Sequence, residues 1–153
     1  MTNGPHDLKD HDSIQSEMMG EMCLVVDKND NVTGSSSKLS CHSGEGIRHR
    51  AFSVLIFDSE SRLLIQKRSS EKITFPGVWA NSCCSHPLDI ESENCGEKGV
   101  ENAAKRKLEQ ELGITTSVTG SWDFHHIGRM EYSCRWDDEW IEREIDHIMV
   151  VFA

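Results

Sequence analysis

Long apolar stretches are missing from the sequence, and this absence limits what the chain can be. No run approaches the roughly 18 consecutive apolar residues that a membrane-spanning helix needs. Residues 1–19 are polar and acidic and contain no apolar core segment, so we expect no secretory signal there. Basic side chains are scarce too: 16 Lys and Arg stand against 26 Asp and Glu, which gives a net charge of −10. Such a molecule repels phosphate, so we expect no nucleic-acid partner and no membrane partner, and any anionic ligand needs a local cationic cluster or a metal ion.

Paired cysteine motifs are also missing. The six cysteines show no C-x-x-C spacing of the kind found in zinc ribbons, and the neighbours Cys83 and Cys84 are poorly placed for a structural disulfide. Without a secretory signal the default compartment is reducing. We therefore expect free or metal-bound thiols and a cytoplasmic location.

The 153 residues fit one domain with one hydrophobic core. Residues 1–20 are polar and contain glycine and aspartate, so we expect a loose arm there, followed by a domain over residues 21–153. No internal repeat is present. The elements that the pattern predicts come in the order strands, helix, strands, which favours α+β or a mixed-sheet α/β sandwich over repeated parallel units.

Apolar periodicity predicts the elements of this domain. Residues 51–57 and 63–68 are β-rich runs joined by a polar turn, so they predict a hairpin. Apolar residues recur with helical spacing over residues 100–112, and Gly113 is placed to cap that helix. Further strands are predicted over residues 21–26, 78–81, 124–132 and 145–153. Residues 35–40 are a polar connection, and we expect a glycine-bearing loop without a stable helix around Gly44 and Gly46.

The stretch Phe75–Pro87 concentrates groups that can carry chemistry. Within it, Cys83, Cys84 and His86 bring two thiols and an imidazole into four positions. A thiol beside a histidine is a candidate nucleophile or proton carrier. The alternative is that these cysteines are buried and inert, because free cysteine is among the most buried residue types. The residues of this stretch alone leave both interpretations open.

Other histidines and cations are candidates with equally plain alternatives. His42 and His49 lie in the glycine-bearing loop and are either surface histidines or metal ligands. Arg68 ends a predicted strand, and Lys72 follows four residues later. These cations form either a solvated face or a clamp for a diphosphate, which bidentate arginine and compact lysine charges suit.

Acidic residues alternate along the last predicted strand. Glu142, Glu144 and Asp146 point to one face of that strand, which is either a solvated acidic edge or a place for a cation. If the fold brings these side chains together, three imidazoles and two carboxylates can bind one metal ion. This set suits Mn²⁺, Fe²⁺ or Zn²⁺ better than Ca²⁺: His42, His49, His86, Glu142 and Glu144.

Five segments in fixed order resemble one family. The chain is similar to type I isopentenyl-diphosphate Δ-isomerases of the Nudix superfamily, from about Met22 to the last residue. The resemblance implies a Nudix-type mixed-sheet α/β/α sandwich and the interconversion of isopentenyl and dimethylallyl diphosphate in isoprenoid biosynthesis. The segments that carry it are His49–Val54, Ile65–Ser69, Lys72–Gly77, Asn81–Pro87 and Trp140–Asp146.

The resemblance also implies a role for individual residues. Cys84 and Glu144 would transfer protons on opposite faces of the substrate alkene, assisted by Tyr132. Glu111 would help to hold Mg²⁺ against the diphosphate of a small-molecule substrate, and we expect the protein to be a monomer. The residues implied to hold a second divalent ion, Mn²⁺ or Zn²⁺, are His42, His49, His86, Glu142 and Glu144. Those implied to face the diphosphate are Lys38, Arg68, Lys72 and Lys107.

The predicted helix separates the isomerase from hydrolases of the same superfamily. Hydrolysing Nudix enzymes resemble R-E-x-x-E-E-x-G here, whereas this chain has Lys107 and Gln110 at two of the acidic positions. The resemblance implies further elements beyond Ala153, so we expect the C-terminal part of the Nudix sheet to be missing. Ile141 and Arg143 stand where the family shows glycine and histidine. The alternatives are a non-catalytic remnant that binds metal and diphosphate, and a Nudix diphosphate hydrolase.

Overall fold

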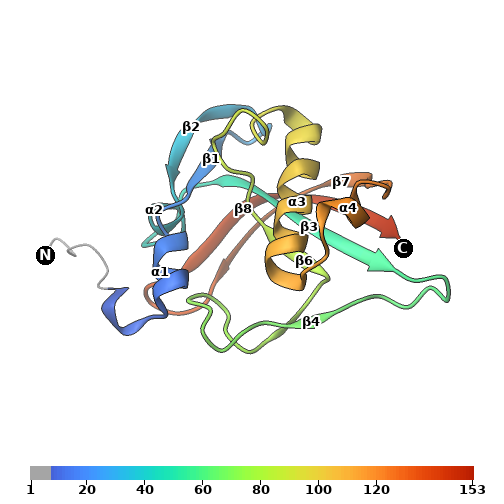
Figure 1. The fold of residues 1–153 in the computed structure, drawn as a ribbon. Helices are drawn as coiled ribbons and strands as arrows, with labels where there is room; N and C mark the ends of the chain where they lie inside the picture. Colours follow the sequence, from blue (N-terminus) through green and yellow to red (C-terminus); the bar gives the residue numbers. More distant parts are fainter. Residues whose placement is uncertain (1–7) are drawn as a thin grey trace, which may run out of the picture.

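A computed structural model describes residues 8–153, and a curled mixed sheet of six strands forms its centre (Figure 1). Strand β3 (His49–Phe57) lies in the middle of this sheet. Strand β8 (Ile141–Phe152) runs parallel to β3 along its whole length, and β7 (His125–Arg135) pairs antiparallel with β8. These long strands confirm those predicted over residues 51–57, 124–132 and 145–153, although β7 and β8 extend further than expected.

Shorter strands occupy the other edge of β3. Strand β1 (Met22–Val26) and strand β6 (Cys83–Ser85) both pair with β3 in the antiparallel sense, and β2 (Val32–Ser37) extends the sheet beyond β1. A separate two-stranded ribbon joins β4 (Gln66–Lys67) to β5 (Trp79–Ala80). Parallel and antiparallel pairs thus share one sheet, as the predicted mixed α/β class requires.

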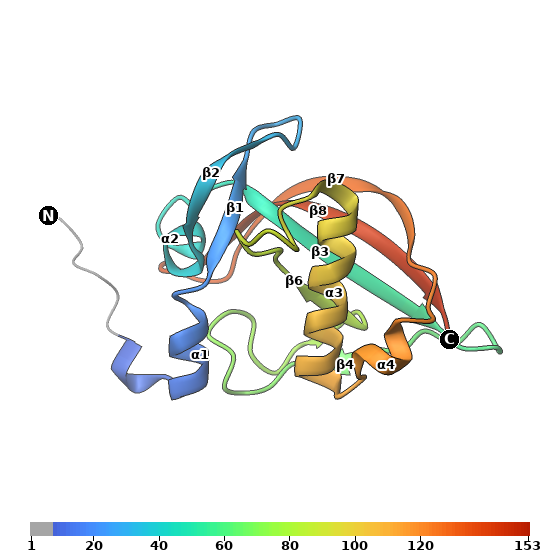
Figure 2. The same cartoon turned by 45° about the horizontal axis from the view of Figure 1, so that its top comes forward.

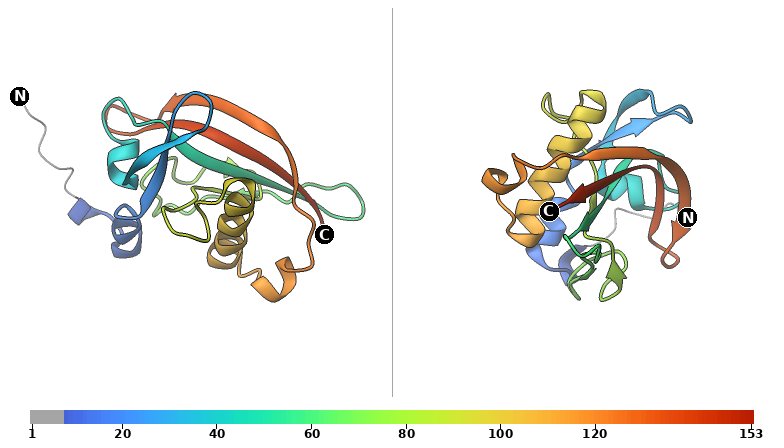
Figure 3. Two further views of the ribbon diagram at one scale, coloured as in Figure 1. Left: turned by 90° about the horizontal axis from the view of Figure 1, so that it is seen from above. Right: turned by 90° about the vertical axis from the view of Figure 1, so that its right-hand side faces the viewer.

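Helix α3 (Gly96–Leu112) crosses the sheet in front of β3 and β6 in Figure 2. Seen from above in Figure 3, α1, α3 and α4 lie on the same side of the long strands. The shorter helical elements are η1 (Leu8–Asp10), α1 (Ser13–Met18), α2 (Lys38–His42) and α4 (Thr116–Thr119).

The helix predicted over residues 100–112 is confirmed and begins four residues earlier. Val100, Ala104 and Leu108 are fully buried and pack with Phe52 of β3 in the main hydrophobic core. This burial fixes α3 on the sheet, since helical stability in proteins comes mostly from packing of an apolar face. Gly113 ends the helix in the left-handed conformation at φ 68°, and its N–H donates to the carbonyl of Glu109.

The hairpin predicted between residues 51–57 and 63–68 forms only next to its turn, and the rest of the predicted pairing is wrong. Both edges of β3 are already occupied by β8 and β6, and the second run touches β3 only through the bridge between Phe57 and Leu63 and an adjacent backbone hydrogen bond. The run then leaves the sheet, and Ile65 is 50% exposed. An apolar run predicts a strand but not the strand with which it pairs. Here β8 and β6, which are more distant in the sequence, pair with β3.

The polar connection predicted over residues 35–40, and the helix-free loop after it, are also wrong. Residues 35–37 complete β2, and α2 follows directly over Lys38–His42. Ser37 caps this helix, because its hydroxyl accepts the N–H of Ser40. Gly44 and Gly46 lie beyond the end of α2, so they do not oppose it.

The loose arm expected over residues 1–20 falls partly outside the described residues. Within residues 8–20 the chain forms η1 and α1, and Asp12 caps α1 by accepting the N–H groups of Ile14 and Gln15. Met19 is 4% exposed and packs with Ile73 and Trp140 in a second hydrophobic cluster. This cluster anchors α1 beside the loop that carries Lys72.

Gly99 lets α3 pack tightly against the loop before it. A Cβ atom at Gly99 would lie 2.1 Å from the carbonyl oxygen of Glu93, which is backbone and cannot move aside. We therefore expect Gly99→Ala to lower the free energy of unfolding by about 1–3 kcal/mol, as overpacking usually does. Gly34→Ala is the matched control, because no heavy atom lies within 4 Å of that Cβ position. Urea denaturation measures both, and equal stability of the two variants would contradict the prediction.

A buried polar network pins the turn between β1 and β2 to the sheet. The carboxylate of Asp30 accepts hydrogen bonds from Arg50 Nε at 2.8 Å, from His147 Nε2 at 2.7 Å and from Arg129 Nη1 at 3.2 Å. His147 Nδ1 lies 2.8 Å from Nε2 of His126 on β7. Asp30 adopts φ 68°, which a non-glycine residue seldom does unless other contacts hold it.

This network makes the free energy of unfolding depend on pH in the acidic range. Burial by itself would raise the pKa of Asp30, but hydrogen bonds from His147 and Arg50 outweigh it and lower the pKa to about 2. The stabilisation, about 2 kcal/mol, is complete above the ordinary carboxyl pKa and is lost as the pH falls through about 2. We expect Asp30→Asn to be less stable than the wild type at pH 7 and the difference to shrink below pH 4. Urea denaturation across this range measures it, and the exposed Glu60→Gln serves as the control without such a profile.

Candidate functional site

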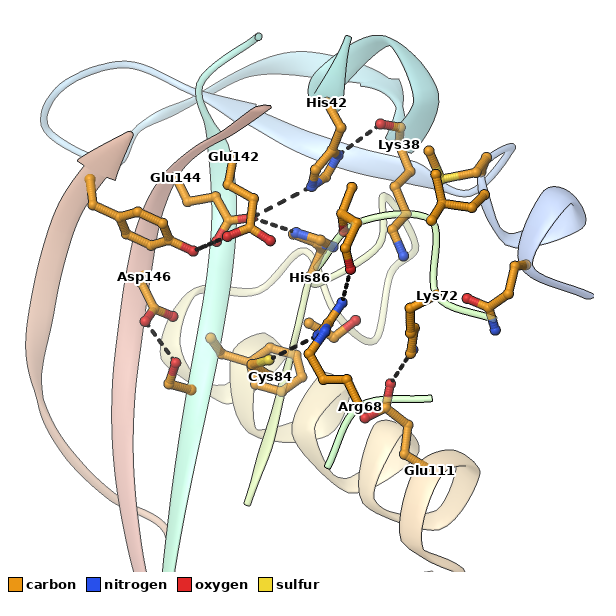
Figure 4. A pocket seen from close by; sticks show the side chains of 18 residues that line it. Lys38, His42, Arg68, Lys72, Cys84, His86, Glu111, Glu142, Glu144 and Asp146 are labelled. Carbon is orange, nitrogen blue, oxygen red and sulfur yellow. Dashed lines mark hydrogen bonds and ion pairs between the residues drawn. The ribbon is translucent and has the colours of Figure 1, made fainter. Parts of the chain in front are cut away.

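One cavity collects most of the side chains that the sequence singled out. It encloses about 680 Å³, part of it open to solvent, and its walls come from α1, α2, β3, β6, α3, β7, β8 and the loop around Lys72. Figure 4 shows a group of histidines and glutamates at one end and lysine and arginine side chains at the other. Cys84 lies in the wall between them.

Three histidines and a glutamate gather at the first end. The ligand atoms of His42, His49, His86 and Glu144 all lie within 4.8 Å of one another. Glu144 Oε1 is 2.9 Å from Nε2 of His86, 3.4 Å from Nε2 of His49 and 3.6 Å from Nε2 of His42. The parallel register places His49 directly beside Glu144, and α2 supplies His42 from its last residue.

Backbone contacts orient two of these imidazoles. His42 Nδ1 lies 2.8 Å from the carbonyl of Lys38, and His49 Nδ1 lies 2.7 Å from the carbonyl of Ile47. Each Nδ1 therefore carries the proton that is donated to the carbonyl, which leaves the lone pair on Nε2 facing the cluster. His49 Nε2 is buried and makes no hydrogen bond, although a buried polar atom is seldom left unpaired.

The electrostatics of the cluster favour a cation. Burial opposes the charge on Glu144, but His86, His42 and His49 outweigh it and hold the pKa of this carboxyl well below its usual range. Burial lowers the pKa of His42 and of His86, so both imidazoles are neutral at pH 7. Burial acts on His49 in the same way, but Glu144 outweighs it and raises the pKa of that imidazole. Neutral imidazoles, one carboxylate and an orphaned buried nitrogen fit a divalent first-row metal ion. Within residues 8–153 no second cluster of this kind occurs.

Tyr132 links the two carboxylates that the sequence paired. Its hydroxyl lies 2.6 Å from Oε2 of Glu144 and 3.0 Å from Oε2 of Glu142. Burial and the neighbouring Glu144 raise the pKa of Glu142 to about 7, and burial together with both carboxylates raises the pKa of Tyr132. Environments that push the pKa values of adjacent carboxyl groups apart are typical of proton-transfer sites. Of the five predicted metal ligands, four meet in the cluster, and Glu142 lies beside it through Tyr132.

The two adjacent cysteines of β6 face opposite ways, as alternation along a strand requires. Cys83 is fully buried in the main hydrophobic core, whereas Cys84 lines the cavity. Burial raises the pKa of Cys84 to about 11, although Arg68, whose Nη1 lies 3.9 Å from Sγ, lowers it. Cys84 is therefore a protonated thiol at neutral pH that faces the cavity, whereas Cys83 is buried in the core.

Cations line the opposite end of the cavity. Arg68 donates to the carbonyls of Phe75 at 2.9 Å and Thr74 at 2.7 Å, which fixes its guanidinium in the wall. Lys72 Nζ lies 3.0 Å from Oε1 of Glu111, and Lys38 completes the group. Burial, followed by repulsion from neighbouring lysines, lowers the pKa of Lys38, so this end attracts an anion.

Lys107 is the one residue predicted to face the diphosphate that the structure does not bring to the wall of this cavity. It is 1% exposed, and its Nζ lies 3.0 Å from Gln110 Oε1 and 3.6 Å from Glu111 Oε1. Lys107 therefore acts on the cavity through Glu111. Residues three and four positions apart on a helix are neighbours, so the Lys107 side chain contacts Gln110 and Glu111 of its own helix.

Five polar residues of the wall were not among the candidates: Gln15, Ser53, Thr74, Ser85 and Asp146. Asp146 shares the alternation of Glu142 and Glu144, so the pattern itself could have indicated it. Nothing in the sequence indicates that α1 contributes Gln15, because that depends on how a distant segment packs.

A family model described as NUDIX domain matches residues 47–153. The chain belongs to the Nudix family. This Nudix chain is 44% identical to an isopentenyl-diphosphate delta-isomerase of Gibberella zeae, over 95% of its own length and 61% of that relative. It is 45% identical to an isopentenyl-diphosphate delta-isomerase of Schizosaccharomyces pombe, over 92% of the chain and 66% of the relative. A chloroplastic isopentenyl-diphosphate Delta-isomerase of Arabidopsis thaliana is also 45% identical, over 92% of this chain and 51% of that relative.

These comparisons confirm the resemblance drawn from the sequence segments. The chain spans 51–66% of the length of these three relatives. Among solved structures, DR0079 from Deinococcus radiodurans superposes with a TM-score of 0.61 at 15% identity, over 87% of this chain and 72% of that one. At such low identity the likeness supports the Nudix-type fold alone. Among the helices of residues 8–153, none combines the length and apolar character of a membrane span.

Proposed function

We propose that this Nudix chain carries the catalytic region of an isomerase that interconverts isopentenyl diphosphate and dimethylallyl diphosphate. The observation that carries the proposal is the pairing, in one cavity, of the protonated thiol of Cys84 with the Tyr132–Glu144 pair. The relatives named above are isomerases of this kind, which supports the substrate. Because the chain covers about three-fifths of their length, the activity is inferred for this region and tested below.

The chemistry needs two proton positions. Moving the double bond by one carbon adds a proton to one carbon and removes a proton from another, with a tertiary cation between the two steps. Cys84 Sγ holds a proton, and Glu144 is an ionised acceptor whose Oε2 lies 2.6 Å from the Tyr132 hydroxyl. Because the reaction is reversible, each group donates in one direction and accepts in the other. Water would trap the cation, so it must be kept from this part of the cavity during the reaction.

The cationic end suits the diphosphate. Lys38, Arg68 and Lys72 line it, and Arg68 is already fixed by two backbone carbonyls. A planar guanidinium and compact ammonium groups are common ligands of phosphate oxygens. We propose that Glu111 helps to hold Mg²⁺ here once the diphosphate engages Lys72, which now lies 3.0 Å from Glu111.

The histidine end would hold the second metal. His42, His49, His86 and Glu144 would bind it, with Glu142 beside them, and we propose Mn²⁺ or Zn²⁺ from the mixture of imidazole and carboxylate donors. A bound divalent ion supplies positive charge that keeps Glu144 oriented and tunes its basicity.

Diphosphate hydrolysis by the same chain is disfavoured. Hydrolysis needs a row of carboxylates to hold the metal ions that activate water. In α3 only Glu111 lines the cavity, and Lys72 and Lys107 lie 3.0 Å and 3.6 Å from its Oε1. The carboxylate is thus largely neutralised by its neighbours.

A direct assay separates the three alternatives. The purified chain, supplied with Mg²⁺ and either Mn²⁺ or Zn²⁺, is incubated with isopentenyl diphosphate and followed by proton NMR for dimethylallyl diphosphate and by phosphate release. Appearance of the isomer without phosphate supports the proposal. Phosphate release favours a hydrolase, and binding without turnover by folded, metal-loaded protein favours a non-catalytic remnant.

The setting proposed for this activity is a cytoplasmic monomer that acts on a small diphosphate, without a nucleic-acid or membrane partner. All six cysteines fall within the described residues and are free thiols, which supports a reducing compartment. The net charge of −10 supports the lack of a nucleic-acid partner. Size-exclusion chromatography with light scattering tests the monomer.

A further inference from the structure

Asp146 is a buried carboxyl group for which the site as described has no use. It follows Glu144 by two positions on β8, lies beside Ala51 of β3 in the parallel register and lines the cavity. It is 5% exposed. A carboxyl group is seldom buried this deeply without full pairing, so its contacts are informative.

Only one of its two oxygens is paired. The hydroxyl of Ser53 donates to Asp146 Oδ2 at 2.8 Å, whereas Oδ1 is buried and has no hydrogen-bond partner. Leaving a buried acceptor unpaired costs about 1–3 kcal/mol, and more for a charged group. A residue kept only to tie β3 to β8 does not need this second oxygen. Figure 4 shows Asp146 on the same side of the cavity as Glu144, with its one bonded oxygen marked by the dashed line.

The position of Asp146 relative to Cys84 indicates what its second oxygen could do. Ser53, which holds Asp146, lies directly opposite Cys84 in the pairing of β3 with β6. Cys84, Asp146 and Glu144 all line the same cavity. The diphosphate is expected at the lysine and arginine end, so the hydrocarbon part of the substrate would extend toward Cys84 and Asp146.

From this placement we infer that Asp146 is a further catalytic residue, whose unpaired oxygen faces the reacting carbons and stabilises the positive charge that develops between the two proton transfers. The inference rests on the isomerase function proposed above. Ser53 is then a positioning residue that turns the other oxygen away from the substrate. A fixed negative group aimed at a developing charge in a buried site is worth much more than in water and needs no reorganisation during the reaction.

Steady-state kinetics of Asp146→Asn tests this inference. The substitution keeps the shape and removes the charge, so we expect kcat to fall about 100-fold, in the range found when one group that stabilises a transition state is removed. KM should change by less than about threefold, since uniform binding of substrate is untouched. Ser53→Ala should shift kcat in the same direction by less. Glu131→Gln makes the same change in net charge on the exposed part of β7 and should keep wild-type kcat.

A binding experiment without turnover separates charge stabilisation from a structural role. Two diphosphates serve as probes: 2-(dimethylamino)ethyl diphosphate, whose ammonium group resembles the cation, and isopentyl diphosphate, whose hydrocarbon end carries no charge. Calorimetry measures the binding of both to metal-loaded protein. The wild type should bind the ammonium compound more tightly, because analogues of the transition state bind better than substrates. Asp146→Asn should reduce this preference at least about tenfold, which corresponds to about 1.4 kcal/mol. Glu131→Gln should leave it unchanged.

Several results would overturn the inference, and they differ from failure of the proposed function. If the wild type isomerises its substrate and Asp146→Asn keeps kcat and the preference for the ammonium compound, Asp146 is not catalytic. If the variant loses metal, as elemental analysis of the purified protein would show, Asp146 supports the metal cluster instead. If the wild type neither isomerises isopentenyl diphosphate nor binds the two probes, the proposed function fails, and this inference fails with it.

Discussion

Replacing Cys84 with alanine should reduce isomerisation of isopentenyl diphosphate at least about 1000-fold, in the upper part of the range for removal of a positioned acid or base. The thiol is the only titratable group of β6 that faces the cavity, since Cys83 points into the core. It lies 3.9 Å from Arg68 Nη1, between the cationic end and the Tyr132–Glu144 pair. Alanine leaves a small gap and nothing that can carry a proton.

Cys83→Ala is the matched control for this prediction. It removes the same atom from the neighbouring residue, but from the hydrophobic core. We expect it to lower the free energy of unfolding by about 1 kcal/mol, as small deletions in a core do, and to leave kcat near the wild-type value. Cys84→Ala should show the reverse, with stability kept and turnover lost. Turnover by folded Cys84→Ala within tenfold of the wild type would contradict the role given to the thiol.

The sequence predicted those parts of the fold that depend on neighbours along the chain. Helix α3 is visible in the spacing of Val100, Ala104 and Leu108, and its end in Gly113, because these signals lie within single turns. The β-rich run of β3 is equally visible. The partner of the run over residues 63–68 could not be predicted, because it depends on distant segments: β8 and β6 pair with β3, and residues 66 and 67 pair with β5 instead.

The candidate site divides in the same way. The types of ligand were predictable, because imidazole and carboxylate groups are the donors that divalent first-row metal ions take in proteins. Their convergence was not, since His86 and Glu144 are 58 residues apart and meet only through the sheet. The resemblance implied a contact between Lys107 and the diphosphate, yet Lys107 is buried behind Glu111, and Asp146 lines the cavity although the resemblance implied no role for it. A motif fixes residue identity, whereas packing decides which side chains reach the cavity.

Replacing one histidine of the cluster should reduce metal affinity by a factor nearly as large as that by which loss of the thiol reduces turnover. His49→Asn retains a donor for the carbonyl of Ile47, which now lies 2.7 Å from Nδ1, and removes only the orphaned Nε2. We expect affinity for Mn²⁺ or Zn²⁺ to fall at least about 100-fold, since even the outer partners of metal ligands are worth 10- to 100-fold. His49 does not line the substrate cavity, so a loss of turnover would not reflect a lost substrate contact. His126→Asn, outside the cluster, is the matched control.

Thermal unfolding tests the same cluster without any substrate. A metal ion that binds the folded chain at about 100 times its dissociation constant stabilises it by about 2.7 kcal/mol. For a chain of this size, Tm should therefore rise by roughly 5–10 °C when the metal-depleted wild type receives Mn²⁺ or Zn²⁺. The rise should vanish in His49→Asn and persist in His126→Asn. Equal rises in all three proteins would place the ion elsewhere, and the carboxylate of Glu144, held among three imidazoles, would then need another partner.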